Sequence, residues 1–525
     1  MVQTLDSLKV EHFENVDNTD FTDAKEREKL KKEINKLRKQ GLEKEYPVVI
    51  DGKEYYTKDK IVSTNPGKKG EIIGYASKVD KELAEKALIK STETFKRWKT
   101  VVPKERANYL FRTAELMQER RHEFSALLVL EAGKNYEEAD AEVSEAIDFM
   151  NFYARSMIQL EEDTHYLKRV PGEKNHLKYV PLGVGFIVPP WNFPLAITIG
   201  LTVSAVVTGN TVLLKPASYT PIIAYKFFEL INEAGLPKGV INFITGDSKE
   251  FGDFVTGHRL TRFISFTGSK DVGLRINEIA GRTAEGQVWI KRVNAEMGGK
   301  DGIVIDETAD LDKAAQSIIT SGFTFQGQKC SAGSRVIVVE EVYEELLNKV
   351  VELARELSVG SGEENQDVGP VIHEKAYNEI LDYIKVGKQE AVLKLGGDTA
   401  GEEGYYINPT IFADVDPNAR IMQEEIFGPV IAFAKAKDWE EGIEIYNNTD
   451  YGLTGGFFSS KQDRLDAAVE RMYCGNLYLN RDITGALVGV HPFGGFNLSG
   501  TDSKAGSYEY LKLFSQGKTY TQADE

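Results

Sequence analysis

The sequence predicts an α/β protein built on doubly wound parallel sheets. Residues 182–266 alternate short apolar runs with helical stretches, and a second series of the same kind begins at Ala295. Strands that alternate with helices at this spacing are typical of parallel βαβ units. The stretch 181–214 carries no charged residue, which indicates a buried strand–loop–helix–strand unit rather than a surface segment.

Length and composition are those of a large globular protein. At 525 residues the chain has room for two or three domains. Its 41% hydrophobic and 28% charged residues do not indicate disorder. The formal charge of −17 argues against nucleic acid or an anionic membrane as a partner. Two cysteines, Cys330 and Cys474, make no disulfide framework and fit a reducing cytoplasm.

Neither a signal peptide nor a membrane span is predicted. Residues 1–20 have acidic and polar side chains throughout and no apolar core. Pro189, Pro190 and Pro194 interrupt the uncharged stretch, so no apolar run reaches the roughly 20 residues that a spanning helix needs. We therefore expect a soluble, cytoplasmic protein.

The first third of the chain is mostly helical. A charged surface helix over 23–38 is followed by a strand pair in 46–57, which turns at Asp51-Gly52. Helices are then predicted over 81–98, 103–131 and 136–160, with Gly133 dividing the last two. Glu145 and Phe149 are four residues apart and share one face of the third helix.

A projecting hairpin is predicted for 165–180, around Pro171-Gly172, and the two alternating series follow it. In the first series we expect strands at 182–188, 210–214, 240–245 and 262–266, and helices at 195–208, 220–234 and 250–257. In the second we expect strands near 301–305 and 334–339, and helices at 311–322 and 342–357.

Cys330 is the first candidate for chemistry. It stands in Phe325-Gln326-Gly327-Gln328-Lys329-Cys330-Ser331-Ala332, a run of small and polar residues that leaves room for a substrate carbonyl. Lys329 is expected to favour the thiolate, which is the nucleophilic form. The alternative is that Cys330 is a small buried hydrophobic residue, as many free cysteines are.

Two further polar residues could act beside a nucleophile. Asn192 lies on a loop stiffened by prolines and could donate a hydrogen bond to an oxyanion. Glu296 is followed by Met297-Gly298-Gly299 and could act as a general base. An ordinary turn also explains each of these two residues when it is taken alone.

A dinucleotide site is predicted at the carboxyl ends of the first strand series. No G-x-G-x-x-G fingerprint is present, but Lys215, Gly246 and Gly268-Ser269 each follow a strand. A lysine can bind ribose hydroxyls, and a hydroxyl at a helix N-terminus suits a pyrophosphate. A surface lysine and turn glycines are the alternative. The seven histidines form no cluster with cysteine, so we expect no metal.

Six motifs, in the order and spacing of one family, resemble the aldehyde dehydrogenase superfamily over nearly all the chain beyond Glu45. They are Pro190-Trp191-Asn192-Phe193-Pro194, Lys215-Pro216-Ala217, Phe266-Thr267-Gly268-Ser269, Glu296-Met297-Gly298-Gly299-Lys300, Gly327-Gln328-Lys329-Cys330 and Glu425-Ile426-Phe427-Gly428-Pro429. The cysteine motif, Thr484-Gly485-Ala486-Leu487-Val488-Gly489 and the glycine-rich segment 492–506 are similar to members that oxidise glutamate semialdehyde.

The resemblance implies a role for each motif. Cys330 would add to the aldehyde, Asn192 would hold the oxyanion and Glu296 would activate water for hydrolysis of the thioester. It implies an NAD-binding Rossmann-like domain and an α/β catalytic domain. The residues implied to contact the cofactor are Val188, Pro189, Pro190, Trp191, Lys215, Ser218, Gly246, Gly252, Gly268, Ser269, Met297, Glu425 and Phe427.

The implied substrate is L-glutamate γ-semialdehyde, which is in equilibrium with a cyclic imine, and the product is L-glutamate. The residues implied to bind it are Glu145, Phe193, Ser331, Gly485, Ala486 and Phe493. Many superfamily members carry glutamate where Ser218 stands, and a carboxylate there would repel the 2′-phosphate of NADP. We therefore expect NAD as the preferred cofactor, with weaker use of NADP.

The implied organisation is a helical extension over 1–45, a cofactor domain over 46–164 and 181–296, and a catalytic domain over 297–490. Residues 165–180 and 491–525 would form an oligomerisation element in a homodimer or larger assembly. Three alternatives stay open: a dehydrogenase for another semialdehyde such as succinate semialdehyde, a cysteine hydrolase or acyltransferase, and a non-catalytic binding protein.

Overall fold

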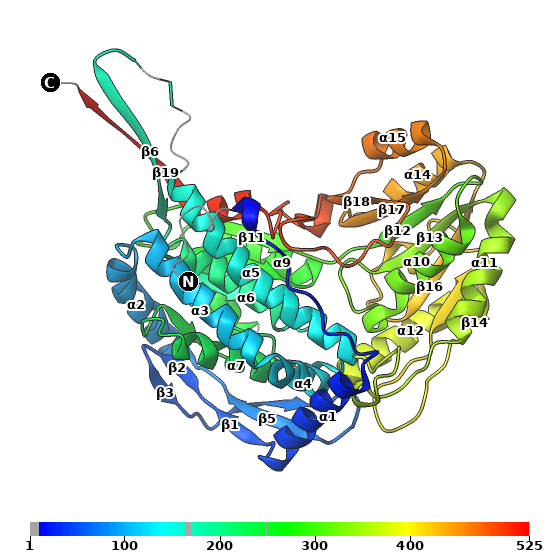
Figure 1. The fold of residues 1–525 in the computed structure, drawn as a ribbon, viewed down its shortest axis with the longest axis horizontal. Helices are drawn as coiled ribbons and strands as arrows, with labels where there is room; N and C mark the ends of the chain where they lie inside the picture. The colour runs from blue at the N-terminus through cyan, green and yellow to red at the C-terminus, as the bar shows by residue number, and fades with distance from the viewer. Residues whose placement is uncertain (1–9, 163–166, 169, 248, 524–525) are drawn as a thin grey trace.

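The structure is a computed structural model, and it describes residues 10–162, 167–168, 170–247 and 249–523. Figure 1 shows two α/β bodies side by side and a strand pair that projects from the first body. Each body contains a seven-stranded sheet, in the orders β11-β10-β7-β8-β9-β2-β3 and β14-β15-β16-β13-β12-β17-β18. The predicted α/β fold with parallel sheets is confirmed.

The first sheet has a parallel centre. Its parallel strands are β7 (Val184–Val188), β8 (Thr211–Leu214), β9 (Ile241–Phe243), β10 (Thr261–Thr267) and β11 (Arg292–Glu296). The chain runs outward through β7, β8 and β9 and then returns to place β10 on the other side of β7. This reversal makes β7 and β10 a topological switch point, where an open α/β sheet binds its ligand.

Antiparallel strands extend the edge of this sheet. β2 (Val48–Ile50) and β3 (Lys53–Tyr55) form the predicted pair, and Asp51 and Gly52 at its turn have φ values of 52° and 74°. β1 (Lys44–Tyr46), β4 (Lys60–Thr64) and β5 (Ile72–Ser77) form a separate three-stranded sheet.

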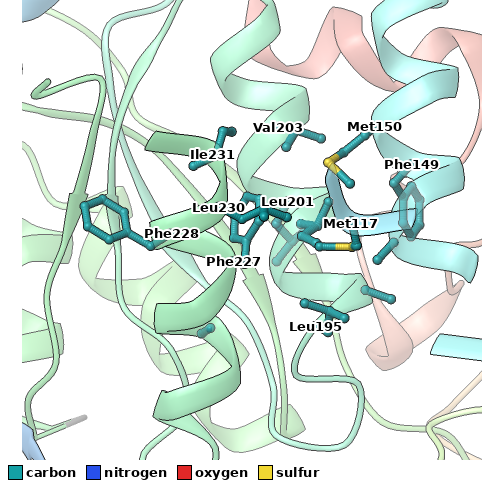
Figure 2. Close-up of a cluster of buried hydrophobic side chains, with 14 of the residues drawn as sticks. Met117, Phe149, Met150, Leu195, Leu201, Val203, Phe227, Phe228, Leu230 and Ile231 are labelled. Carbon is teal, nitrogen blue, oxygen red and sulfur yellow. The ribbon is translucent and has the colours of Figure 1, made fainter. Parts of the chain in front are cut away.

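Helices cover both faces of the first sheet. Alternate strand residues explain this, because Phe186 and Leu213 pack with α2 (Lys81–Trp98), α8 (Glu250–Gly257) and α9 (Lys270–Gly281) on one face. The opposite face is covered by α3 (Pro103–Glu119), α5 (Tyr136–Glu162), α6 (Ala196–Val207) and α7 (Pro221–Glu233). Figure 2 shows the core between these helices, where Met117, Phe149, Leu201 and Phe227 meet.

The helix predicted over 103–131 is two helices in the structure. Arg120, with φ −107° and ψ 21°, separates α3 from α4 (Arg121–Ala132). The break redirects the chain, so that α4 packs against α5 and against α1 (Ala24–Lys39). Gly133, with φ 71°, ends α4 at the predicted division before α5.

The second sheet is also mostly parallel and has its own set of helices. It contains β12 (Asp301–Ile305), β13 (Gly333–Val339), β14 (Val392–Leu395), β15 (Thr410–Ala413), β16 (Val430–Ala436), β17 (Thr454–Phe458) and β18 (Asn476–Leu479), of which only β14 is antiparallel to its neighbour. Its helices are α10 (Leu311–Phe323), α11 (Glu340–Arg355), α12 (Glu374–Glu390), α13 (Arg420–Gln423), α14 (Trp439–Asn447) and α15 (Gln462–Arg471).

The chain then returns to the first body. Tyr510, Leu511 and Phe514 join the core beneath α5 and α6, and β19 (Ser515–Ala523) pairs antiparallel with β6 (Glu173–Pro181). The alternation predicted within 165–180 therefore forms one strand whose partner is the C-terminal strand, more than 300 residues away. Residues 165, 166 and 169 of the predicted hairpin lie outside the described residues.

Candidate active site

Cys330 lies on a tight loop between α10 and β13. The three residues Phe325, Gln326 and Gly327 have left-handed backbone conformations, with φ values of 50°, 57° and 68°. A Cβ atom at Gly327 would lie 2.4 Å from the carbonyl oxygen of Gly428, so glycine is needed both for the conformation and for the close approach. The cysteine loop is thereby packed directly against the segment that carries Glu425 and Phe427.

The Cys330 thiol is half-buried and lies among acidic groups. Burial raises its pKa above the usual value, and the carboxylates of Asp301, Glu425 and Glu296 raise it further. The sulfur is therefore a neutral thiol in this state of the protein, and a base has to take its proton when it reacts.

The predicted role of Lys329 in favouring the thiolate has to be corrected. The Lys329 ammonium donates to Thr324 Oγ1 at 2.8 Å, and Glu138 is the carboxylate that most strongly favours its charged form. Its charge is thus directed to the side of the loop that faces α5, and the charged groups that act most strongly on the pKa of Cys330 are acidic.

Asn192 is positioned by contact with the cysteine loop. It is buried on the loop that follows β7, and its Nδ2 donates to the carbonyl oxygen of Gln328 at 3.0 Å. Gln328 precedes Cys330 by only two residues. The Asn192 amide therefore lies next to the backbone of Cys330. A donor to the oxyanion that forms when Cys330 adds to a carbonyl has to lie there.

Glu296 is the last residue of β11, and its carboxylate is buried. One oxygen accepts from the Gly495 N–H at 2.9 Å, and the other accepts from the N–H and hydroxyl of Ser503 at 3.1 and 2.5 Å. Burial raises the pKa of Glu296 to about 7, although these three donors oppose the shift. A carboxyl with this pKa can exchange protons near neutral pH.

Glu425 lies against the glycines that follow Glu296. Its carboxylate accepts from the Gly299 N–H at 3.0 Å, and a Cβ atom at Gly298 would lie 2.2 Å from the same carboxylate. Burial raises the pKa of Glu425 to about 7. Close by, the ring of Phe427 makes an edge contact with Trp191, with centroids 5.4 Å apart.

The carboxyl edge of the first sheet carries groups that suit a dinucleotide. Lys215 follows β8 and is buried, and burial lowers its pKa to about 8. Ser269 stands at the N-terminus of α9, and its hydroxyl does not cap that helix. A cationic group, a hydroxyl and a helix N-terminus at one edge fit the ribose and diphosphate of a dinucleotide.

The other predicted cofactor residues surround the same edge. Gly268 donates its N–H to the carbonyl oxygen of Glu296 at 3.1 Å, so the turn before α9 adjoins the candidate base. At Gly246 a Cβ atom would lie 3.0 Å from Phe251 and from Val79, so these two side chains would have to shift to admit a larger residue. Val188, Pro189 and Pro190 begin the Asn192 loop, Ser218 lies in the turn after β8, Gly252 lies in α8, and Met297 follows β11.

Glu145 lies on α5, the helix whose Glu138 accepts from the Phe325 N–H of the cysteine loop. Burial raises its pKa to about 8, and the neighbouring carboxylates of Glu142 and Asp148 contribute. The charges of Lys134 and Lys329 lower it again, which places Glu145 in one electrostatic cluster with both lysines. A cationic group bound beside Glu145 would favour its ionised form.

The structure brings some of the predicted substrate residues to the cysteine loop directly. The ring of Phe193 contacts that of Phe325 with centroids 6.2 Å apart, and Ser331 follows Cys330. The Ile483 N–H donates to Ser321 Oγ of α10 at 3.1 Å, so the segment that leads to Gly485 and Ala486 starts beside this loop. Among the described residues, no hydrogen bond joins Glu145, Gly485 or Ala486 to it.

Known proteins resemble this chain over almost its whole length. The profile of the aldehyde dehydrogenase family matches residues 53–520, which is most of the chain. The chain belongs to the aldehyde dehydrogenase family.

Close relatives within the family share one name. A 1-pyrroline-5-carboxylate dehydrogenase from Geobacillus sp. strain WCH70 is 55% identical over 505 residues, covering 96% of this chain and 98% of the relative. One from Bacillus subtilis strain 168 is 53% identical over 506 residues, with the same coverage.

Solved structures of the family agree with the fold. A 1-pyrroline-5-carboxylate dehydrogenase from Thermus with bound NAD has a TM-score of 0.96 at 46% identity, covering 98% of this chain and 99% of that chain. Proline utilization A from Bdellovibrio bacteriovorus has a TM-score of 0.95 at 40% identity, and 97% of this chain corresponds to 53% of that chain.

Residues outside the predicted set also lie beside the cysteine loop. The Lys134 ammonium lies 4.0 and 4.1 Å from the ring centroids of Phe193 and Phe325, and it pairs with Glu142 at 2.9 Å. The other oxygen of Glu142 accepts from the Leu195 and Ala196 N–H groups. Glu138, Glu142 and Glu145 recur at helical spacing, which is the signal that could have identified a functional face of α5.

Two other kinds of feature are absent from the described residues of this enzyme. No group of three or more histidine, cysteine or acidic side chains among them could hold a metal ion. No helix among them is long and apolar enough to cross a membrane.

Proposed function

We propose that this enzyme oxidises L-glutamate γ-semialdehyde, the open-chain form of 1-pyrroline-5-carboxylate, to L-glutamate with NAD. One observation carries the proposal: Asn192 from the loop after β7 donates to the Cys330 loop, and Gly299, three residues after Glu296, packs against the Cys330 carbonyl oxygen. The names and the bound NAD of the relatives support the choice of substrate and cofactor.

Cys330 begins the reaction by adding to the aldehyde carbon. A carbon–sulfur bond forms, the carbonyl oxygen becomes an oxyanion and the thiol proton passes to a base. Because the pKa of Cys330 is raised, the thiol keeps its proton until it reacts, and water at the site accepts that proton.

Asn192 and the Cys330 backbone N–H stabilise the oxyanion. Asn192 is fixed for this task by its hydrogen bond to Gln328, which orients the amide before substrate arrives. Oxidation leaves the acyl group on Cys330 as a thioester. Glu296 then takes a proton from water, the resulting hydroxide attacks the acyl carbon, and L-glutamate leaves as the carbon–sulfur bond breaks.

The carboxyl edge of the first sheet would hold NAD. Lys215 and Ser218 would bind the adenosine ribose, Ser269 the diphosphate and Glu425 the nicotinamide ribose. When NAD is bound, its nicotinamide ring supplies the hydride acceptor for the oxidation. Ser218 places no carboxylate near the adenosine ribose, so weaker use of NADP is also proposed.

The amino-acid end of the substrate would lie between α5 and the 485–486 segment. Glu145 would pair with the α-ammonium group, and Ser331 with the backbone N–H groups of Gly485 and Ala486 would bind the α-carboxylate. Gly485 has φ 74°, and a Cβ atom added to it would meet nothing within 4 Å, which leaves its backbone accessible. Phe193 and Phe493 would flank the aliphatic carbons.

Two observations weigh against the alternatives. A cysteine hydrolase normally needs a histidine beside its nucleophile, yet no described histidine makes a hydrogen bond or ion pair with Cys330. Succinate semialdehyde has no ammonium group, so an enzyme specific for it would have no use for Glu145. Comparison of kcat/KM for the two semialdehydes distinguishes these substrates.

Replacement of the nucleophile tests the proposed function. Cys330→Ala should abolish NADH formation from glutamate semialdehyde, measured by absorbance, because no thiohemiacetal can form. NAD should still raise the melting temperature of the variant, since Cys330 is not among the residues proposed to bind it. Undiminished NADH formation by Cys330→Ala would refute the assignment.

We further propose the biological setting and the division of the chain. The reaction belongs to proline or arginine breakdown in the cytoplasm. The chain would divide into an extension over 1–45, a cofactor domain over 46–164 and 181–296, and a catalytic domain over 297–490. Residues 165–180 and 491–525 would form the contact of a homodimer or larger homo-oligomer.

A further inference from the structure

The segment before α1 runs along α5 and is attached to it repeatedly. Figure 1 shows this dark-blue segment beside the helix. The Val10 N–H donates to Gln159 at 3.3 Å, and Thr19 donates both its N–H and its hydroxyl to Asp140 at 2.7 and 2.8 Å. Phe13 packs edge-on against Phe152 with centroids 5.2 Å apart. This N-terminal strap, residues 10–19, is therefore a fixed part of the first body.

One side chain of the strap joins two other parts of the protein. Asn15 Nδ2 donates to Asp148 Oδ2 at 2.9 Å and to the carbonyl oxygen of Val488 at 3.0 Å. Asp148 and Val488 are both buried, with 3% and 4% exposed. The Val16 N–H donates to the second oxygen of Asp148 at 2.9 Å, which fixes that carboxylate from both sides.

The two groups that Asn15 joins lie beside the two parts of the proposed substrate site, namely Glu145 and the backbone of Gly485 and Ala486. Asp148 lies one helical turn after Glu145 on α5, and its charge is one of those that shift the pKa of Glu145. Val488 follows Gly485 and Ala486 by two to three residues. Asn15 therefore ties the helix that would bind the α-ammonium group to the segment that would bind the α-carboxylate.

The 485–486 segment depends on this kind of anchor. The space around Gly485 is open, so this part of the segment has few packing contacts of its own. Its attachment lies at Gly489, where a Cβ atom would meet Phe152 at 2.9 Å and Phe13 at 3.3 Å. The Gly489 N–H donates to the carbonyl oxygen of Gly506. The strap thus contributes both a hydrogen bond and an aromatic contact to the base of the segment.

We propose that Asn15 is a positioning residue that determines selectivity for aldehydes with an amino-acid end. It sets the separation between Glu145 and the backbone of Gly485 and Ala486 without touching the substrate. The proposal rests on the proposed function, because that function assigns the α-ammonium group to Glu145 and the α-carboxylate to Gly485 and Ala486. An aldehyde with no charged end, such as propanal, uses only the cysteine loop and does not depend on this separation.

Paired substrates and a matched variant test the proposal. Asn15→Ala should raise KM for glutamate semialdehyde about tenfold with kcat changed less than about twofold, as loss of one hydrogen-bonded bridge allows. KM for propanal and for NAD should stay unchanged. Asn18→Ala is the matched control, because Asn18 is exposed on the same strap and makes no hydrogen bond among the described residues.

A second variant removes the bridge from its other end. Asp148→Asn would place an NH2 group against Asn15 Nδ2 while its carbonyl oxygen still accepts from the Val16 N–H, so it should reproduce the selective rise in KM. It also keeps the test decisive if Asn15→Ala fails to fold.

Each outcome separates this proposal from the function on which it rests. If the unmodified enzyme does not prefer glutamate semialdehyde to propanal, the proposed function fails. If it has that preference and both bridge variants keep it, only the role of Asn15 fails. An equal rise in KM for both aldehydes would likewise overturn that role and indicate a general effect on structure.

Discussion

Burial and hydrogen bonding act in opposite directions on the Glu296 carboxyl. Burial raises its pKa, while the donors of Gly495 and Ser503 stabilise the ionised form, and the balance is a pKa of about 7. The same donors hold the carboxylate against the 495–503 segment. Glu296 therefore has to leave them to reach water beside the thioester, and its readiness as a base depends on pH in the neutral range.

This balance predicts how hydrolysis of the thioester depends on pH. The steady-state rate after the first turnover should rise between about pH 6 and 8, because the fraction of ionised Glu296 rises as pH passes its pKa. Glu296→Gln should show a burst of about one NADH per site followed by a steady rate about 10²- to 10⁴-fold slower and without that rise. Stopped-flow absorbance measures both phases.

Two outcomes of the Glu296→Gln experiment would contradict the role of Glu296 in activating water. A Glu296→Gln burst followed by a steady phase at the wild-type rate would show that another group activates water. A missing burst would instead place Glu296 before the thioester, in removal of the thiol proton.

At the residue scale, the sequence indicated which residues are candidates for the site better than it indicated what surrounds each of them. Cys330, Asn192 and Glu296 could be singled out because their local motifs are unusual. The pairing of Lys329 with Thr324 and the acidic surroundings of Cys330 could not, since both depend on how the chain folds around the loop. Small neighbours in the sequence indicated space for a substrate, but they did not indicate that acidic groups surround the Cys330 sulfur.

At the scale of elements, two helix N-termini in the first body are capped from a distance. Neither α6 nor α7 has a capping side chain of its own. Glu142 accepts from the Leu195 and Ala196 N–H groups at the start of α6. Glu131 accepts from the Ile222 and Ile223 N–H groups of α7 at 2.9 and 2.8 Å. A buried carboxylate on a neighbouring helix thus replaces the local cap.

Loss of the second cap should reduce stability. Glu131→Ala leaves two N–H groups of α7 without their acceptor and removes the shorter hydrogen bond of the Ser63 hydroxyl, so the free energy of unfolding should fall by about 3 kcal/mol. Denaturant unfolding measures this change. Glu115→Ala on α3 is the control, because Glu115 is exposed and makes no hydrogen bond among the described residues.

The size of the Glu131 effect should depend on pH. Burial raises the pKa of Glu131 to about 7, above its unfolded value near 4.5, so the folded protein binds the extra proton between these values. Stability from this group is fully present below about pH 4.5 and is lost as pH rises through about 7. The deficit of Glu131→Ala should therefore be larger at about pH 5 than at about pH 8, and a deficit that grows with pH would contradict the assignment.

Elements were predicted well wherever local signals sufficed. The predicted bounds of α2 and α8 agree with the structure at both ends, and β12 does as well. The break at Arg120 was missed because no glycine or proline marks it. The partner of β6 was missed because alternation identifies a strand but not the strand that pairs with it.

At the scale of the whole molecule, the site exists only because distant segments return to it. The chain after β18 crosses back to the first body, where Gly495 and Ser503 bind Glu296 and Val488 binds Asn15. Local patterns could place each segment in an element, but not beside its partner. The family resemblance implied that the motifs meet, since spacing alone does not bring residues hundreds of positions apart together.

The projecting strand pair has its own consequence at this scale. β6 and β19 form a two-stranded sheet on which nearly every residue of β19 is exposed, and Tyr520 is 48% exposed. Isolated two-stranded sheets are marginally stable in water, so we expect a second copy of the chain to cover this pair. Deletion of residues 517–525 should therefore convert the assembly to monomers, as measured by light scattering coupled to gel filtration.

The deletion is placed so that the body of the protein keeps its contacts. A chain that ends at Gln516 retains the hydrogen bonds from Arg292 to the carbonyl oxygen of Ser515 and from Arg262 to Gln516. The core residues Tyr510 and Phe514 also remain. A control that ends at Ala523 keeps all of β19 and should keep the native mass. An unchanged mass for the chain that ends at Gln516 would show that the strand pair does not hold the copies together.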